Sequence, residues 1–300
     1  MAGRISDITR MTEAGVDVVF NRTVQALTQK RYPLICTEKN LKRRIGSYNT
    51  IGDFTAAAIK DEGDTIPYDK VQHYLETTIT SYTVAKGAEA SLEQIHYDLE
   101  NVVLPRFGMP LVKPLLQYKE KLIAELYNDA FTTTGADGKY LIDDDHPLQS
   151  SVLVNNNLAT GALGLDAFIA AKQKFNYIYD QAGEFYDTEP THLLIHPDQI
   201  YKAKQIIESI LVPFELVNTK NVANDVMPIR IITNKYIDAT KWFLLDRSLQ
   251  DCGAILQTSK GLMLETWWEK NNSVFRGMAK EMYGAGIVSP GYGIVGSTGI

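Results

Sequence analysis

The clearest periodic pattern lies near the middle of the chain, where apolar residues recur every three to four positions. The stripe consists of Leu115, Lys119, Leu122, Ile123, Leu126 and Ala130. This spacing predicts one amphipathic helix, roughly 25 Å long at 1.5 Å per residue. Pro114 suits the first turn of that helix, whereas Pro105 and Pro110 are expected to interrupt the stretch before it.

A polar, strand-like pattern precedes this helix between residues 63 and 90. Residues 74–84 read YLETTITSYTV, and Thr and Tyr favour strands. Gly87 is expected to end the strand, and Ser91 with Gln94 fits a helix capping box just after it. The alternation puts polar residues on both faces, and an isolated two-stranded ribbon is marginal in water. This predicted hairpin therefore needs a surface supplied from elsewhere.

Ahead of the hairpin, one helical pattern is followed by an irregular, basic stretch. Apolar residues at helical spacing from Val16 to Leu27 predict a helix that Tyr32-Pro33 ends. Residues 34–62 are expected to be irregular. Their basic residues fit either a nucleic-acid patch or a partner-facing loop, and the lack of interleaved aromatic residues favours the loop. These basic residues are Lys39, Lys42, Arg43 and Arg44.

The second half of the chain alternates short helical and strand patterns. Asp166 is expected to cap a helix that turns Phe168, Ala171, Phe175 and Ile178 inward. A second helix is predicted over 198–209, and strands over 191–195, 229–233 and 242–245. This order predicts a compact α/β or α+β domain over residues 150–262. Two long antiparallel strands are predicted at 262–269 and 274–282, joined by a tight connection at 270–273.

Composition and charge place the chain among folded proteins that do not depend on phosphate contacts. Its 300 residues are 45% hydrophobic and 22% charged, with a formal net charge of −6. A nucleic-acid binder held by phosphates needs clustered Lys and Arg, which this balance argues against. No signal peptide and no membrane-spanning apolar run is recognisable, which predicts a cytoplasmic protein. Cys36 and Cys252, without CxxC spacing, are expected to be free thiols.

Two groups of side chains are candidates for metal chemistry. Asp143, Asp145 and His146 fall in the sequence DDDHP, but the spacing fits neither an EF-hand loop nor a zinc-binding histidine pair. An acidic surface turn is the favoured interpretation. His192 and His196 share one face of a strand by parity, although a strand end and a helix entry explain them equally well.

Recognised catalytic motifs are missing from the sequence. The tail from Gly291 to Gly296 formally matches GxGxxG, but too few residues follow to form the helix that receives a dinucleotide pyrophosphate. There is no G-x-S-x-G elbow, no P-loop and no HExxH. The sequence therefore predicts a protein that is not an enzyme, with no catalytic, cofactor-binding or metal-binding residues and no cofactor.

The order of these elements resembles the major capsid proteins of tailed bacteriophages with the Hong Kong 97 fold, particularly the Mu-like major head subunits. Three short segments carry the resemblance: 137–147 (DGKYLIDDDHP), 191–197 (THLLIHP) and 282–290 (MYGAGIVSP). The chain departs from the Mu-like form at Leu141-Ile142, where an aromatic residue is common. The resemblance implies an α+β capsid fold with an N-terminal arm, an extended β-hairpin loop, a long spine helix and an α/β apical domain.

The resemblance also implies domain boundaries. The expected parts are an N-terminal arm at 1–55, an extended loop at 56–90, a peripheral domain with the spine helix at 91–149 and 263–290, an axial domain at 150–262, and a C-terminal tail at 291–300. The arm and the loop would reach over adjacent subunits. The axial domain would gather around the five-fold and six-fold axes.

The function implied is that of a major capsid protein that self-assembles as pentamers and hexamers into an icosahedral shell around double-stranded phage DNA. Its expected partners are further copies of itself, the packaged DNA without sequence-specific binding, and scaffold, portal and decoration proteins, with no membrane. The expected location is the virion, after assembly in the host bacterial cytoplasm. The alternatives are an encapsulin-like nanocompartment shell and a metal-dependent enzyme that uses Asp143, Asp145, His146, His192 or His196.

Overall fold

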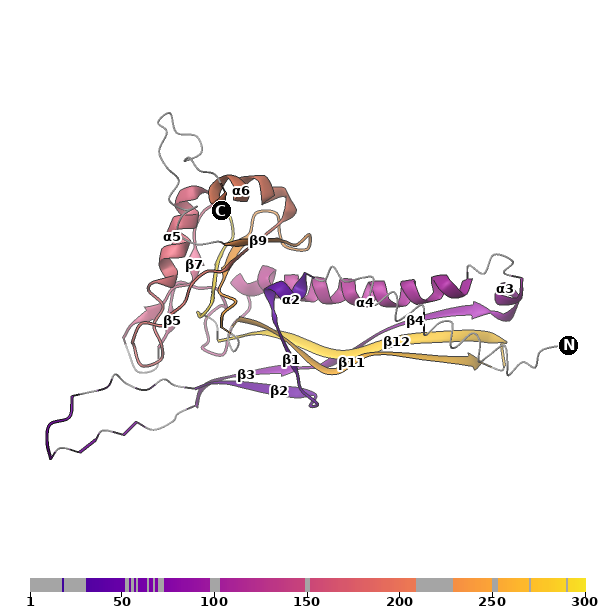
Figure 1. Ribbon diagram of the computed structural model, residues 1–300, viewed down its shortest axis with the longest axis horizontal. Helices are drawn as coiled ribbons and strands as arrows, with labels where there is room; N and C mark the ends of the chain where they lie inside the picture. The colour runs from indigo at the N-terminus through magenta and orange to yellow at the C-terminus, as the bar shows by residue number, and fades with distance from the viewer. Residues whose placement is uncertain are drawn as a thin grey trace.

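The computed structural model describes residues 31–51, 73–97, 103–148, 152–208, 229–249, 253–269, 271–289 and 291–300, together with Val18 and scattered positions from 54 to 69. The helix expected between Val16 and Leu27 lies outside these residues, apart from Val18, which is helical. The molecule is elongated: a long strand layer carries one long helix, a compact unit rises at one end, and a hairpin projects away (Figure 1). None of the described helices is long and apolar enough to cross a membrane.

The long layer is a four-stranded sheet in the order β1-β11-β12-β4. Its strands are β1 (Thr37–Asn40), β11 (Gly253–Glu269), β12 (Val274–Val288) and β4 (Tyr82–Ser91). Strands β11 and β12 form the predicted antiparallel pair, and β1 lies parallel to β11 on the edge. The connection between β11 and β12 includes Ser273 at a positive φ of 50°.

The long strands extend further than the sequence predicted. Strand β11 begins at Gly253 rather than near residue 262, with irregular register around Lys260. Strand β4 continues through Gly87 to Ser91, because β12 pairs with it along its whole length and places Met278 opposite Gly87. The expected strand end at Gly87 was therefore wrong, whereas the capping box is confirmed at Ser91 and Gln94, where α3 (Leu92–His96) begins.

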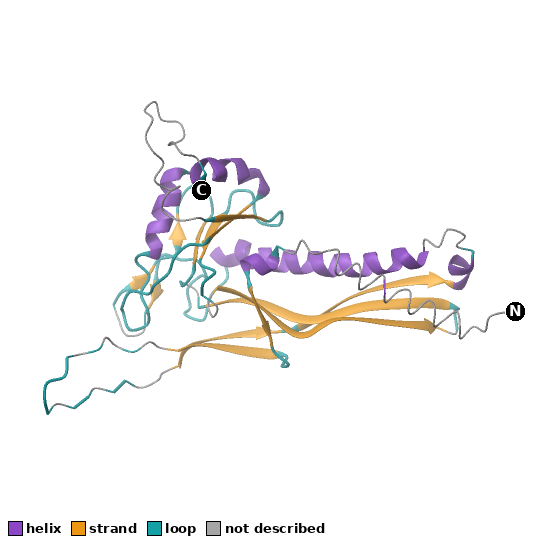
Figure 2. Ribbon diagram, in the orientation of Figure 1, coloured by secondary structure: helices purple, strands orange, loops and turns teal. Residues whose placement is uncertain are grey.

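The spine helix α4 runs from Val103 to Asn128 and lies along one face of the long sheet (Figure 2). It starts earlier than predicted and includes Pro105, Pro110 and Pro114, so the interruption expected at Pro105 and Pro110 and the first-turn position expected for Pro114 were both wrong. Each proline lacks an N–H donor for the helix. Buried residues of this face pack against β12 and hold the helix together through that stretch. They are Leu111, Val112 and Leu115, which form one cluster with Phe275 and Ala279 of β12.

The compact unit is built on a five-stranded sheet in the order β7-β13-β10-β8-β9. The strands are β7 (Leu158–Ala159), β13 (Ile294–Ser297), β10 (Trp242–Leu245), β8 (His192–Ile195) and β9 (Arg230–Thr233). The predicted strands at β8, β9 and β10 are confirmed. The segment expected to be a C-terminal tail instead supplies β13, which lies between β7 and β10 with all four residues buried.

Two helices accompany this sheet, α5 (Leu165–Phe175) and α6 (Ile200–Ile207). The inward residues predicted for α5 are buried, but Asp166 is not its cap, because Gly164 occupies the N-cap position and Asp166 lies in the first turn. The helix predicted over 198–209 begins as a 3₁₀ turn, η2 (Pro197–Gln199), and continues as α6. These helices and the sheet share one apolar core around Trp242 and Phe168.

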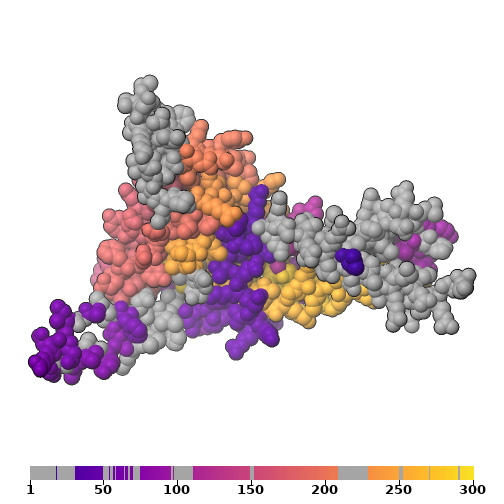
Figure 3. All heavy atoms as spheres, in the orientation of Figure 1, coloured from indigo at the N-terminus to yellow at the C-terminus, as the bar shows by residue number. Residues whose placement is uncertain are grey.

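The stretch expected to be irregular after residue 34 contains ordered elements. Helix α2 (Tyr32–Ile35) opens with the Tyr32-Pro33 pair that was expected to end a helix, and proline fits a first turn. It is followed by β1 and by β2 (Ile45–Ile51). Figure 3 shows this indigo segment crossing the molecule between the compact unit and the long sheet.

The loop after the spine helix is held by short elements. The 3₁₀ helix η1 (Asp129–Phe131) follows α4, and β5 (His146–Pro147) pairs with β6 (Val154–Asn155). The predicted turn before residue 139 is present, with Gly138 at a positive φ of 81°. The short strand predicted at residues 140–142 is reduced to an isolated bridge between Thr134 and Tyr140.

Candidate assembly surface

The feature with the least internal support is the hairpin made by β2 and β3 (His73–Thr80). The hairpin predicted between residues 63 and 90 was wrong in its pairing, because β3 pairs with β2, outside that range, and β4 pairs with β12 in the long sheet. The two strands pair antiparallel from Ile45 opposite Thr80 to Ile51 opposite His73. Among the described residues beyond these strands are several large apolar side chains left open to solvent. They are Phe54 (58% exposed), Ile59 (98%), Ile66 (56%) and Tyr68 (87%). Exposed apolar residues of this kind on a projecting element are typical of a protein interaction surface.

The base of the hairpin is fixed to the long sheet by close backbone contact. A Cβ atom at Gly284 of β12 would lie only 2.3 Å from the carbonyl oxygen of Thr80. Glycine is therefore the residue that allows β3 to approach β12 this closely. Beside this contact, Ile79 is 3% exposed and packs in a small apolar cluster with Ile255 and Val288.

A buried polar group completes this attachment. Gln257 is fully buried, and its Oε1 accepts a hydrogen bond of 3.1 Å from the Tyr48 hydroxyl. Its Nε2 donates to Ser81 Oγ at 3.0 Å. A Cβ at Gly46 would lie 1.8 Å from Gln257 Oε1, so β2 also needs glycine at the contact. Gln257 thus links the start of β2 to the residue that follows β3.

A groove opens next to this attachment. It is lined by Lys42, Arg43, Arg44, Ser81, Tyr82, Thr83, Ser259, Lys260 and Met282, with a cavity volume of about 500 Å³. Four of these nine described residues are cationic, and none of the nine is acidic. The backbone here is well held, because Ser259 Oγ donates a 2.7 Å hydrogen bond to the Arg43 carbonyl. We call this the basic groove.

The spine helix is joined to β12 by a buried ion pair between Lys119 and Glu281. Their side chains are 7% and 6% exposed. Lys119 Nζ also lies 4.9 Å from the centre of the Tyr283 ring and 5.7 Å from that of Tyr32. Burial, together with the charge of Glu281, raises the pKa of both tyrosines. Lys119 was predicted to belong to the buried stripe, and it does so as a paired charge.

The segment before α2 ties the compact unit to the spine helix. The backbone N–H of Arg31 donates to Glu120 Oε1 at 2.6 Å, and the N–H of Tyr32 donates to the same oxygen at 3.1 Å. The Arg31 guanidinium donates to Thr233 Oγ1 at 2.8 Å. One residue therefore bridges α4 and β9.

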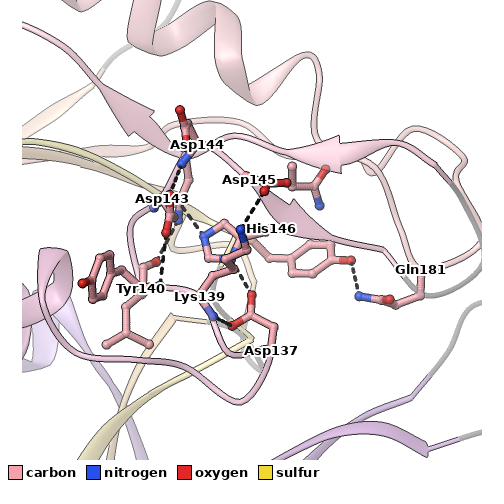
Figure 4. A network of polar contacts seen from close by, with 12 residues as sticks. Asp137, Lys139, Tyr140, Asp143, Asp144, Asp145, His146 and Gln181 are labelled. Atoms are coloured by element: carbon pink, nitrogen blue, oxygen red, sulfur yellow. Dashed lines mark hydrogen bonds and ion pairs between the residues drawn. The ribbon is translucent and has the colours of Figure 1, made fainter.

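The acidic turn of the sequence is built around a buried histidine (Figure 4). His146 Nδ1 lies 2.5 Å from Asp137 Oδ2, and both side chains are 4% exposed. His146 Nε2 lies 3.1 Å from Asn157 Oδ1. The Asn157 amide is oriented by its Nδ2, which donates to the Leu141 carbonyl at 3.0 Å. Each ring nitrogen of His146 therefore faces the side-chain oxygen of a neighbouring residue.

The carboxylates beside His146 are occupied by local contacts. Asp145 accepts an ion pair from Lys139 at 2.6 Å, and the Asp143 carboxylate accepts the N–H groups of Tyr140 and Asp144. Burial alone would raise the pKa of Asp143, but these hydrogen bonds outweigh it and lower that pKa. Asp144 is exposed and Asp145 is partly exposed, as an acidic surface turn predicts. By contrast, the side chains of His146 and Asp137 form a buried pair. Nothing in the sequence pattern indicated that Asn157 contacts the His146 ring.

The other candidate ligands do not meet. His192 begins β8 and His196 follows its end, so four steps along the strand, roughly 13 Å, separate their backbone positions. His192 contacts Thr191 Oγ1 at 2.8 Å, and His196 caps η2 by accepting the N–H of Asp198. Within the described ranges, no three His, Cys, Asp or Glu side chains are grouped to hold a metal.

Only one of the two cysteines falls within the described residues. Cys36 is a buried free thiol, and its Sγ–H donates to the Tyr32 carbonyl at 3.1 Å. Burial raises the pKa of Cys36 to about 12, despite the opposing charge of Arg247. This thiol is therefore protonated at neutral pH, as expected of a structural cysteine. Cys252 lies outside the described residues.

Comparisons with known proteins agree with this architecture. The profile of a family described as phage capsid protein matches residues 75–289. The capsid of cyanophage P-SCSP1u is similar in structure, with a TM-score of 0.57, 11% identity, and coverage of 87% of this chain and 85% of that one. No curated protein sequence matches the chain.

Two further solved structures share the fold. Microbacterium phage Oxtober96 gives a TM-score of 0.54 and 9% identity, covering 89% of this chain and 90% of that one. A virus-like particle from Pyrococcus furiosus gives 0.52 and 12%, covering 95% and 96%. Together they establish a Hong Kong 97-like capsid fold.

The family match covers well over half of the chain, and the chain belongs to the phage capsid protein family. It is a structural major capsid protein and a component of the virion capsid. The nanocompartment alternative is not favoured, because the profile that matches is that of phage capsids.

Proposed function

We propose that this chain assembles as pentamers and hexamers into an icosahedral shell that encloses double-stranded phage DNA. The observation that carries the proposal is the projecting β2–β3 hairpin, whose apolar side chains include Ile59 at 98% exposure. A neighbouring copy provides the surface on which these apolar side chains of the hairpin pack. Within residues 1–55 and 56–90, the segments outside β1 and β4 act as the arm and loop that reach over adjacent subunits, because β1 and β4 belong to the long sheet of their own subunit. Residues 150–262 gather at the symmetry axes, apart from the start of β11 at Gly253, which belongs to the same long sheet.

The further partners follow from the same proposal. Packaged DNA is enclosed without sequence-specific binding, and the net charge of −6 supports a container that does not adhere strongly to it. Scaffold, portal and decoration proteins complete the particle. Purification of the shell from cells that express the neighbouring genes tests these partners, since each should co-purify with assembled particles and not with free subunits.

We also propose that the chain carries no catalytic activity and no metal. The local contacts of Asp143, Asp145 and His146 and the separation of His192 from His196 support this proposal. Metal analysis of the purified protein is the direct test. A stoichiometric transition metal that is lost in His146→Ala would overturn it.

Assembly itself is tested by negative-stain electron microscopy combined with light scattering on the recombinant protein. Closed shells, or rings of five or six copies, are the expected result. A species that stays monomeric or dimeric, even when co-expressed with its neighbouring genes, would contradict the proposal.

The hairpin is tested by shortening it without disturbing its base. Replacing residues 52–72 with Asn-Gly keeps β2 and β3 and closes them with a tight turn. The shortened protein is expected to fold but to form few or no stable shells. A control that substitutes Ser for Tyr118, an exposed residue of α4 outside the proposed contacts, should assemble normally. Normal shells from the shortened chain would refute the role of the hairpin.

A further inference from the structure

The basic groove holds more positive charge than the described chain neutralises. Lys42, Arg43, Arg44 and Lys260 are all exposed, and none has an ion-pair partner among the described residues. Like charges gathered in one groove repel one another, so an anionic ligand that enters it is stabilised.

The groove is also a shaped site rather than a run of surface lysines. The Arg43 carbonyl is held by Ser259 Oγ at 2.7 Å, and Ser259 Oγ in turn lies 2.7 Å from Ser81 Oγ. These contacts fix the main chain beneath the cations. Tyr82 and Met282 add apolar contact surface to the lining, which suits a peptide segment better than a free ion.

The projecting hairpin supplies a matching acidic segment. Residues 60–64 read KDEGD, with three carboxylates to one lysine. Asp61 and Glu62 are exposed and have no ion-pair partner among the described residues, and Gly63 turns the chain at a φ of 94°. By contrast, the acidic turn near His146 is a poorer match, because Lys139 already neutralises Asp145.

The length of the hairpin separates its acidic tip from the basic groove at its own base. Residues 45–62, if extended at ~3.3 Å per residue, span roughly 55 Å. A segment of that length can carry Asp61 and Glu62 away from the groove at the base of the same hairpin, and Figure 1 shows the pair β2 and β3 projecting away from the long sheet. When the acidic tip of one copy binds the basic groove of another, the two copies meet head to tail. Repeated contacts of this kind close into a ring if the rotation that relates neighbouring copies permits it.

We infer that the basic groove, formed by Lys42, Arg43, Arg44 and Lys260, receives Asp61 and Glu62 from the hairpin of a second copy of this chain. This inference rests on the proposed function. It adds a specific electrostatic contact at which the tip of one subunit docks beside the hairpin base of the next.

A charge exchange tests the contact. Arg43→Glu with Arg44→Glu, and separately Asp61→Lys with Glu62→Lys, are each expected to raise the critical concentration for assembly by at least about tenfold. Combining all four substitutions should restore assembly close to that of the wild type. Assembly is measured by light scattering and sedimentation, and folding of each variant is checked by its thermal transition.

The matched control is Lys113→Glu with Lys121→Glu at exposed positions of α4, outside the regions proposed to contact other copies, which changes the net charge by the same amount as the groove variant. It should assemble as the wild type does. A groove variant that behaves like this control, or a defect that the tip substitutions do not rescue, overturns the inference.

The alternative occupant, a nucleic-acid phosphate backbone, gives a different result. In that case shells of the groove variant would retain less DNA, and the tip variant would assemble normally. The variant with all four substitutions would not regain DNA retention. Shells that form from the groove variant at wild-type concentration would reject the docking contact and leave shell assembly standing. Failure of the wild-type protein to assemble would instead reject the proposed function.

Discussion

Two regions of the molecule differ in how much apolar surface they bury: the junction where the spine helix and the two main sheets meet, and the projecting hairpin. At the junction, residues of the spine helix, the long sheet and the five-stranded sheet share one buried cluster that includes Tyr127, Phe243 and Tyr283. Beyond Ile51, the hairpin leaves Ile59 and Tyr68 almost fully open to solvent. One region can fold within a single subunit, whereas we propose that the other is completed by a neighbouring copy. Stability and assembly should therefore respond to different substitutions.

The largest loss of stability is expected from Phe243→Ala. This ring is fully buried and lies 5.3 Å from the ring of Tyr127 and 5.9 Å from that of Phe131. The cavity should lower the free energy of unfolding by about 3–5 kcal/mol, as measured by denaturant titration of the unassembled subunit. Phe54→Ala, in the exposed part of the hairpin, is the control and should change it by less than about 0.5 kcal/mol.

Breaking the buried ion pair should have a comparable effect on the spine helix. Glu281→Ala leaves Lys119 buried without its carboxylate, which costs about 3–5 kcal/mol. The control is Glu125→Ala, which removes an exposed pair with Lys121 and should cost only about 0.3–0.5 kcal/mol. Similar losses for the two variants, in the same denaturant titration, would contradict the role given to the buried pair.

A smaller effect is expected where the two regions join. Gly284→Ala drives a methyl group against the Thr80 carbonyl and should cost about 1–3 kcal/mol. Hydrogen exchange should show faster opening of β2 and β3 than of β10. Gly261→Ala is the matched control, because no atom lies within 4 Å of its Cβ position. Equal exchange in both variants would argue against this contact.

The compact unit should also show a modest dependence on pH. Burial, with the charges of Arg247 and Arg230, lowers the pKa of His192 below its ordinary value of 6.5, while Asp246 opposes the shift. The unfolded chain then binds the proton more readily, so stability falls as pH drops from 6.5 toward the folded pKa, by at most about 1.4 kcal/mol per unit. His192→Gln should flatten this slope, and an unchanged slope would count against it.

The smallest effect on unfolding should come from the hairpin itself. Ile59→Ser with Tyr68→Ser removes apolar surface that the subunit does not bury, so its thermal transition should shift very little. Assembly should nevertheless weaken, as followed by light scattering at a series of subunit concentrations. A lower thermal transition with normal assembly would reverse the proposed division between the two regions.

Sequence reasoning worked where one local pattern decides the structure. The apolar stripe from Leu115 to Ala130 identified the spine helix, and the residues at 274–282 identified a long strand. The Ser91 capping box was predictable because its two hydrogen bonds join residues three apart in sequence. The likeness to phage capsids likewise came from short segments in a fixed order.

It failed where distant segments decide. Gly87 continues a strand because β12 lies beside it, and α4 runs through Pro110 and Pro114 because packing on the sheet supports it. Strand β13 was taken for a tail because its four residues become a strand only between β7 and β10.

By itself, the sequence determined most of the local helices and strands, since these depend on the order of neighbouring residues. Only the tertiary structure decided which charges are buried and which stay open. It buried His146 between Asp137 and Asn157, paired Lys119 with Glu281, and gathered the basic groove from Arg43 and Lys260, which are far apart in the chain. Burial and ion pairing depend on contacts between distant segments, which the spacing of residues along the chain does not predict.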